Sequence, residues 1–358
     1  MRRYMVVVVM ALLCVLGAQA QDTIEVIPVD SVGYMMAMSP DGRFIATAEL
    51  GAIHNDEILP EYLPIRLFDA PSGEALFTFE GASDYASSLA FSPDGSTLVT
   101  HHNVGWLYVW DTNTGERIQE IPALPEGGRI FYMPDGAHLL QAFNYLRPTL
   151  LQWDVANSAI TAALLDRFNT RQEMQELSTV ARIDYILDAV ILDDNQTAIT
   201  STTMNDIIQW DLNTGEQTYL LDDEVEIPNF DIRHIALSQD ESSLFYIHSR
   251  NGTVNVIDLA TGEESTIFES DDNIYALGSA SEADVLAWVA GERESPVLYI
   301  TSLADPSAMT ELPLVSDDGS YGDVTAVVEV ALSPDGTQIF VGGFFNTEGE
   351  NVILKITL

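Results

Sequence analysis

A four-residue turn sequence recurs along the chain at the spacing of a small supersecondary unit. Ser-Pro-Asp-Gly stands at residues 39–42, 92–95 and 333–336, and Met-Pro-Asp-Gly is a variant at 133–136. Proline presets φ at the second turn position, aspartate bonds back to the backbone, and glycine accepts positive φ. Each turn joins two short apolar runs, which is the signature of a β-hairpin. The repeat therefore predicts a chain built from hairpins.

A second motif recurs five times along the chain. An alternating apolar run ends in an aromatic or aliphatic residue plus aspartate, and a polar turn such as DTNTGE comes next. We interpret the aspartate as the start of another hairpin turn and the tryptophan as a packing residue, with Gly115 supplying the unusual φ. The five copies are Phe68-Asp69, Trp110-Asp111, Trp153-Asp154, Trp210-Asp211 and Ile257-Asp258.

Together the two motifs define a unit of four strands, a to d, with a turn between a and b and another between c and d. Full units are centred on Asp41, Asp94, Asp135, Asp194 and Asp240, at intervals of 41–59 residues. A sixth unit is degraded, with Ala280–Asp284 in place of the first turn. The seventh stops one strand short.

The missing strand lies at the other end of the chain. Thr23–Val29 (TIEVIPV) belongs to no complete hairpin there. If it pairs with Val352–Thr357, the ring closes and no sheet edge stays open. The sequence thus predicts one all-β domain over residues 21–358, with seven four-stranded antiparallel blades.

Residues 1–20 have the three parts of a secretory signal peptide. Arg2 and Arg3 precede an apolar run over Tyr4–Leu16, and Ala18-Gln19-Ala20 forms the expected cleavage site. The run is short of the ~20 apolar residues that span a membrane, so an uncleaved anchor is the weaker alternative. Cleavage would remove Cys14, the one cysteine, and leave no disulfide. We expect a secreted or periplasmic protein, with attachment to the cell surface left open.

The charge of the chain is strongly acidic. Fifty-five acidic residues face 14 basic ones, for a net charge of −41, and Lys355 is the one lysine. Such a chain repels phosphate backbones and anionic lipid surfaces, which excludes nucleic-acid binding and membrane insertion after signal cleavage. The charge also keeps a protein soluble and dispersed, so we expect a monomer.

The two motifs at blade spacing resemble the tryptophan–aspartate (WD-repeat) β-propeller family, specifically its divergent bacterial members. The resemblance covers most of residues 22–358 and implies a seven-bladed β-propeller. It also implies a non-catalytic platform that binds proteins or peptides through loops on one face.

The sequence departs from that family in the residues that usually bond to the tryptophan. The loops before strand a contain no histidine, and Asn251 stands where the family has an aspartate. We therefore expect the tryptophans to act as packing wedges without the family's buried hydrogen-bond network. On this view, Trp110→Phe is a mild change.

Acidic residues concentrate in the loops that join strand d of one blade to strand a of the next. Solvated surface charge, a basic protein partner and bound Ca²⁺ each fit this pattern. The spaced D-x-D-x-D-G pattern of a calcium loop is missing. Residues with a possible role are Asp222, Asp223 and Glu226 before blade 5, Glu269, Asp271 and Asp272 before blade 6, and Asp317 and Asp318 before blade 7. Of these, the six aspartates are the weak candidates for metal ligands.

Histidines form a second candidate set. His54 lies in a loop of blade 1, and His101 and His102 end strand b of blade 2. They have no regular ligand spacing, so we expect solvent-exposed histidines available to a partner rather than a metal site. An insertion at Asp166–Asp184 has a capping-box pattern and predicts a short amphipathic helix.

Catalytic signatures are missing from the sequence: it has no G-x-S-x-G, no H-E-x-x-H and no glycine-rich phosphate loop. A binding platform is the leading interpretation. A Ca²⁺-dependent binding protein, or a metal-dependent hydrolase of the lactonase-propeller kind that uses the acidic loops, is the alternative.

Overall fold

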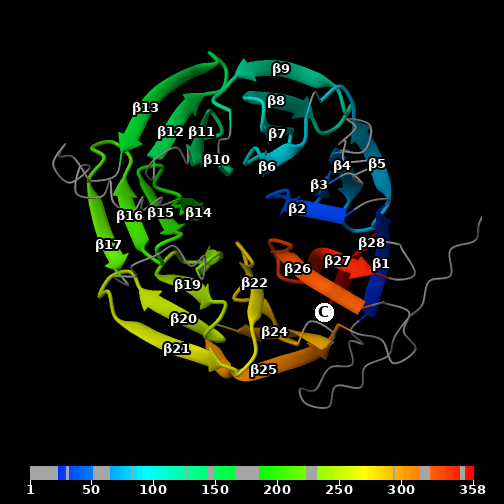
Figure 1. Ribbon diagram of the computed structural model, residues 1–358, viewed down its shortest axis with the longest axis vertical. Coiled ribbons are helices and arrows are strands. Elements are labelled where there is room, and N and C mark those ends of the chain that lie inside the picture. Colours follow the sequence, from blue (N-terminus) through cyan, green and yellow to red (C-terminus); the bar gives the residue numbers. More distant parts are fainter. Residues whose placement is uncertain are drawn as a thin grey trace, which may run out of the picture.

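The protein is a ring of seven four-stranded antiparallel sheets, seen along its axis in the computed structural model of Figure 1. The predicted all-β, seven-bladed β-propeller is confirmed. The structure describes residues 23–29, 32–50, 65–82, 84–125, 128–142, 149–165, 185–222, 232–292, 295–302, 304–314, 323–346 and 351–358. These residues contain no helix. The helix predicted within Asp166–Asp184 lies outside them, as does the predicted signal peptide.

Each blade runs from an inner strand a, beside the axis, to an outer strand d. Blade 1 holds β2 (Val32–Met38), β3 (Phe44–Leu50), β4 (Ile65–Asp69) and β5 (Ala75–Phe79); blade 2 holds β6 (Ala86–Phe91), β7 (Thr97–His102), β8 (Trp106–Asp111) and β9 (Arg117–Pro122); blade 3 holds β10 (Ile130–Tyr132), β11 (His138–Ala142), β12 (Thr149–Asp154) and β13 (Ala159–Leu165); blade 4 holds β14 (Ile186–Ile191), β15 (Thr197–Thr202), β16 (Ile207–Asp211) and β17 (Gln217–Leu221).

The remaining blades follow the same order, except that the last one takes its outer strand from the start of the chain. Blade 5 holds β18 (Ile235–Leu237), β19 (Ser243–His248), β20 (Thr253–Asp258) and β21 (Glu264–Glu269); blade 6 holds β22 (Ile274–Ser279), β23 (Leu286–Glu292), β24 (Ser295–Ser302) and β25 (Asp305–Pro313); blade 7 holds β26 (Asp323–Leu332), β27 (Gln338–Asn346), β28 (Asn351–Thr357) and β1 (Thr23–Val29).

The ring closes where β1 pairs with β28, as predicted. The antiparallel register runs from Thr23 opposite Thr357 to Val29 opposite Asn351. The buried Lys355 Nζ lies 3.0 Å from Glu25 Oε2 across this pair and also donates to the carbonyl of Pro71 in blade 1. The single lysine of the chain therefore joins both ends of the ring.

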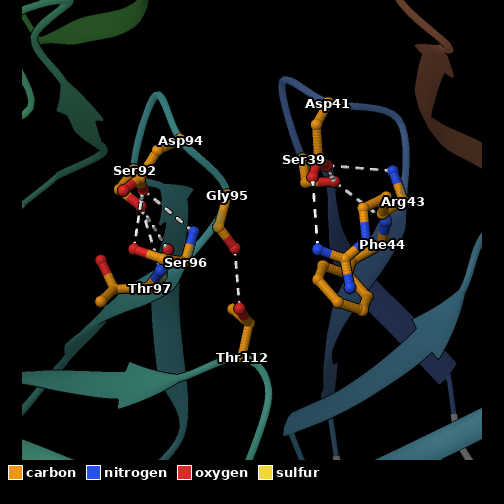
Figure 2. A network of polar contacts seen from close by, with 10 residues as sticks. All are labelled: Ser39, Asp41, Arg43, Phe44, Ser92, Asp94, Gly95, Ser96, Thr97 and Thr112. Atoms are coloured by element: carbon orange, nitrogen blue, oxygen red, sulfur yellow. Dashed lines mark hydrogen bonds and ion pairs between the residues drawn. The ribbon is translucent and has the colours of Figure 1, made fainter.

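In blades 1, 2, 5 and 7, a serine–aspartate pair closes the a–b hairpin by side-chain hydrogen bonds, as Figure 2 shows for blades 1 and 2. Ser92 Oγ donates to Asp94 Oδ1 at 2.6 Å and accepts the Thr97 amide at 3.0 Å. Ser39, Ser238 and Ser333 repeat the bond to their aspartates. The Ser92 hydroxyl lowers the pKa of Asp94, and the hydroxyls of Ser242 and Ser238 lower that of Asp240 to about 2.

The a–b turns of neighbouring blades also meet one another, so that they form a belt around the ring. The Asp135 amide donates to Asn195 Oδ1 at 2.7 Å, and the Asp193 amide donates to Glu241 Oε1 at 2.8 Å. The Glu282 amide donates to the Pro334 carbonyl at 2.9 Å. Gly42 lies so close to Pro334 that a Cβ there would come within 2.9 Å of the proline ring. The belt couples each blade to the next.

The aspartates of the second motif organise the c–d turns, as predicted. Asp111 Oδ1 accepts the amides of Asn113 and Thr114 at 2.8 and 2.9 Å, and Gly115 has φ 74°. The same arrangement holds at Asp69, Asp154, Asp211 and Asp258. In blade 2 the c–d turn bonds to the a–b turn, since Thr112 donates to the Gly95 carbonyl at 2.7 Å (Figure 2). Both kinds of turn therefore lie on one side of the ring, the turn face.

The tryptophans are packing wedges, but the prediction that they lack hydrogen bonds is wrong. Trp110 Nε1 donates to Thr100 Oγ1 at 3.0 Å. The same threonine oxygen lies 2.9 Å from His102 Nε2. His102 Nδ1 lies 2.8 Å from the carbonyl of Asp84. In blade 2, a histidine at the end of strand b thus takes the place of a loop histidine. The expectation that no loop before an inner strand contains a histidine is wrong for blade 5, because His234 lies just before β18. Trp210 and Trp153 donate to Thr200 and Gln141, both at 2.9 Å.

Candidate functional site

The loops between blades and the b–c turns share the face opposite the turn face, here called the loop face. The Ala123 amide, after β9, donates to the carbonyl of Gly105 in the b–c turn of blade 2 at 2.9 Å. Ser270, after β21, makes the same bond to Gly252 in blade 5 at 2.9 Å. The loops between blades and the b–c turns are therefore adjacent on this face.

Four of the acidic candidates lie on the loop face within the described residues, and all four are exposed to solvent. Asp222 follows β17, Glu269 ends β21, and Asp271 and Asp272 follow it. They are available to a partner without rearrangement of the core. The candidates Asp223, Glu226, Asp317 and Asp318 lie outside the described residues.

No group of three or more histidine, cysteine, aspartate or glutamate side chains that could hold a metal ion occurs within the described ranges. Because half of the six aspartates proposed as ligands fall outside those ranges, the calcium hypothesis stays a prediction.

The histidines do not form the exposed surface that we expected. His101 and His102 are both 0% exposed, because strand b lies inside the blade. His101 Nδ1 lies 2.6 Å from Ser87 Oγ, and its Nε2 lies 3.2 Å from the Leu124 carbonyl. Burial lowers the pKa of both rings, that of His102 to about 4, so both are neutral. Direct contact with a partner is excluded for these two; His54 lies outside the described residues.

A cavity of about 470 Å³ occupies the axis of the ring, among the inner strands of blades 3 to 7. The inner strands surround the centre of Figure 1. Three ionisable side chains meet in this cavity: Arg129, just before β10; Asp188, within β14; and Glu329, within β26. Arg129 Nη1 lies 3.0 Å from Asp188 Oδ1, and Nη2 lies 3.8 Å from Glu329 Oε2.

The two carboxylates of the cavity are held differently. Asp188 also accepts the backbone amides of Ala189 at 3.0 Å and Ile235 at 3.1 Å, whereas among the described residues Glu329 has only the longer contact with Arg129. Burial raises the pKa of both, and the neighbouring charge of Asp188 adds to the effect on Glu329, whose pKa rises to about 7. Asp188, which has two amide donors and the closer contact with Arg129, keeps the negative charge, and Glu329 carries a proton that is exchangeable near neutral pH.

Sequence reasoning missed this cluster. Asp188 and Glu329 each interrupt an apolar inner strand, in ILDAVI and in VVEVAL. The sequence contained one signal for this cluster, namely a charged residue within an apolar inner strand. Such a residue stands out because the inner strands are otherwise buried. Its meaning depended on a contact between blades 3, 4 and 7, which nothing local in the sequence specifies.

Comparisons with known proteins agree with the repeat. Residues 73–100, from the end of blade 1 into blade 2, match the WD40 family, "WD domain, G-beta repeat". The chain is 27% identical over 206 residues to WD repeat-containing protein 1 of Xenopus tropicalis, across 56% of this chain and 30% of that protein. It is 31% identical over 99 residues to the Mus musculus protein of the same name, across 26% of this chain and 16% of that protein. The matches thus span less than a third of these relatives.

Solved structures show the same fold over nearly the whole chain. The β-propeller domain of Myceliophteria thermophila Cps50 (Swd1) superposes with a TM-score of 0.69 at 13% identity, covering 94% of this chain and 99% of that one. The structure of U3-55K gives a TM-score of 0.69 at 13% identity, covering 94% and 98%. The chain therefore has the fold of a seven-bladed β-propeller, and its repeat is similar to that of WD-repeat proteins.

Proposed function

We propose that this protein is an exported, non-catalytic platform that binds a basic protein through the acidic part of its loop face. The observation that carries the proposal is the exposure of Glu269, Asp271 and Asp272 beside blades 5 and 6, with Asp222 one blade away. WD-repeat propellers typically act as protein-interaction platforms, and exposed carboxylates on a rigid ring attract and orient a cationic partner. The net charge of −41 extends that field.

Export is supported by the sequence pattern of residues 1–20. Among the residues that the structure describes, no helix is long and apolar enough to span a membrane. We propose a mature chain that begins at Gln21 and is secreted or periplasmic. Mass spectrometry of the N-terminal peptide from the native host tests this; retention of Arg2 and Arg3 would contradict it. Membership of a bacterial branch of the family is part of the same proposal, whereas the matched relatives are frog and rodent proteins.

The binding proposal is tested by charge reversal on the loop face. A triple variant, Glu269→Lys with Asp271→Lys and Asp272→Lys, is compared with the wild type in pull-downs from the exported fraction. The matched control reverses Glu116 and Glu263, which are exposed on the turn face. We expect the triple variant to lose the captured protein, the control to keep it, and capture by the wild type to weaken steeply with salt.

Capture that survives the triple reversal would contradict this placement of the partner site. Turnover of ester or lactone substrates that depends on added metal would instead support the hydrolase alternative. For the calcium alternative, the expected result is a melting temperature that rises with Ca²⁺ more than with equal Mg²⁺.

A further inference from the structure

The axial cavity contains more carboxyl groups than cations. Its charged lining consists of one guanidinium, from Arg129, and four carboxyls, from Asp188, Asp193, Glu241 and Glu329. The guanidinium is engaged by Asp188 at 3.0 Å, so it has little capacity left for Glu329 at 3.8 Å. Within the described part of the chain, Arg129 is the one ionic partner recorded for Glu329. Glu329 therefore shares the single guanidinium with Asp188, and the described lining of the cavity holds no second cation.

The walls of the cavity and its opening suit an organic molecule. Phe131, Val190, Ile235 and Leu277 line it with carbon, and its volume of about 470 Å³ lies in the range of small-molecule sites. It reaches the turn face between blades 4, 5 and 6, where the lining residues Asp193, Gln239 and Ser281 are exposed. Water and small solutes have a route from that side.

We infer that the axial cavity binds an aliphatic amine, with its ammonium group beside Glu329 and its carbon chain against the apolar walls. An ammonium group has three N–H donors and no acceptor. It therefore suits the Glu329 carboxylate, which accepts no hydrogen bond from the described residues. An anion is disfavoured, because Arg129 is already paired and the other charged groups are acidic. A metal ion is disfavoured as well, since the described residues contain no suitable group of three ligands. This site is separate from the loop face, so it stands or falls independently of the proposed protein partner.

Ligand binding is expected to depend on pH through Glu329. Its pKa of about 7 reflects burial and the nearby Asp188, partly offset by Arg129. The flanking strand β22 contributes Tyr275, which donates to the Gly291 carbonyl, and β27 contains no titratable residue. Burial and the charge of Arg129 lower the pKa of His234, just before β18, to about 3, so it stays neutral. A bound ammonium favours the ionised carboxylate, so binding releases a proton. Affinity is expected to rise about tenfold between about pH 6 and about pH 8.

Calorimetric titration of the full chain with cadaverine, pentylamine and the matching uncharged pentanediol tests the inference. We expect both amines to bind and the diol not to bind. Because amine binding releases a proton, the observed heat should vary linearly with the ionisation enthalpy of the buffer. Glu329→Gln should weaken amine binding at least tenfold at about pH 8 and remove the pH dependence. The control Glu116→Gln, on an exposed c–d turn, should leave both unchanged.

Three outcomes would overturn the inference: equal binding of the diol, amine binding that Glu329→Gln leaves intact, or no heat with any amine at millimolar concentration. The diol comparison uses the wild-type protein alone, so it does not depend on the folding of a variant. Capture of a basic protein on the loop face neither supports nor contradicts the cavity site.

Discussion

At the residue scale, one threonine hydroxyl determines what the motif tryptophan does in blade 2. His102 Nδ1 faces a backbone carbonyl and must carry the proton, so its Nε2 accepts from Thr100, whose oxygen then accepts from Trp110. All three side chains are almost completely buried. A buried donor or acceptor left without a partner costs about 1–3 kcal/mol, so each member of this chain of bonds stabilises the others.

Replacement of Trp110 separates the packing and hydrogen-bonding roles of the indole. We expect Trp110→Phe to lower the free energy of unfolding by about 2–4 kcal/mol, from lost volume and the lost bond to Thr100. The control is Trp288→Phe, because the buried Trp288 Nε1 has no hydrogen-bond partner among the described residues. In denaturant unfolding, Trp288→Phe should lower the free energy of unfolding by about 1 kcal/mol less than Trp110→Phe does. Equal losses would mean that the Trp110 bond contributes nothing.

Glu329 gives a pH-dependent prediction at the same scale. Its folded pKa of about 7 exceeds its ordinary value of 4.5, so the folded state holds a proton that the unfolded state releases. Stability from this group is present below pH 4.5 and is lost as the pH rises towards 7. Since 17% of the side chain is exposed, we expect a loss of about 2–3 kcal/mol.

The matched measurement is denaturant unfolding of the wild type and Glu329→Gln across that pH range. The variant does not titrate at this position, so it should be as stable as the wild type in acid and more stable at about pH 8. Parallel stability curves for the two proteins would show that Glu329 has an ordinary pKa.

At the element scale, the a–b hairpin is the unit that the chain repeats and varies. Gly42, Gly95, Gly136 and Gly336 have φ of 66–70° at the end of their turns. Blades 4 and 5 have Asn195 and Glu241 at that position, both with φ 55°. Those two side chains accept amides from the adjacent blade, Asn195 from Asp135 and Glu241 from Asp193. The contact between blades offsets a backbone conformation that these residue types rarely adopt.

Ser92 is expected to contribute more to the free energy of unfolding than Ser96 in the same hairpin. Ser92 is 5% exposed and bonds to both Asp94 and the Thr97 amide. Ser92→Ala should therefore cost about 1–2 kcal/mol of unfolding free energy. Ser96 also bonds to Asp94, but it is only partly buried and that bond is exposed to solvent, so Ser96→Ala should change stability by less than about 0.5 kcal/mol. Similar losses in the two variants would contradict a buried role for Ser92.

At the scale of the whole molecule, the closing pair β1–β28 leaves blade 7 without an open edge. Seven residue pairs form this ladder, and Lys355 bonds to Glu25 and Pro71 across it. The ends of the chain thus depend on each other for burial, and the ring behaves as one cooperative body. Opening it would expose β28 to pairing with other chains.

Deletion of the closing strand tests this dependence. A chain that starts at Ser31 should melt at a clearly lower temperature than the wild type and should aggregate in size-exclusion chromatography. A chain that starts at Gln21 keeps β1 and is the control. Unchanged melting of the shorter chain would show that the β1–β28 pair is dispensable.

Much of the fold was predictable because its determinants are local. The Ser-Pro-Asp-Gly turns and the aspartate-led c–d turns act within a few residues, so five turn centres and two irregular units were enough to count seven blades. The closure followed from one unpaired strand at each end, because an open sheet edge is unfavourable. The exposed acidic residues Asp222, Glu269, Asp271 and Asp272 were also identified from their place between strands.

The buried polar contacts were decided by the tertiary structure alone. His102 and Thr100 are two residues apart on one face of β7, and the pairing of β7 with β8 brings the Trp110 indole to Thr100, which motif spacing does not show. Arg129, Asp188 and Glu329 come from three blades, and only the curvature of the closed ring places them around one axis. Turn chemistry acts over a few residues and is written in the sequence, whereas charge balance and burial along the axis depend on which strands the ring brings together.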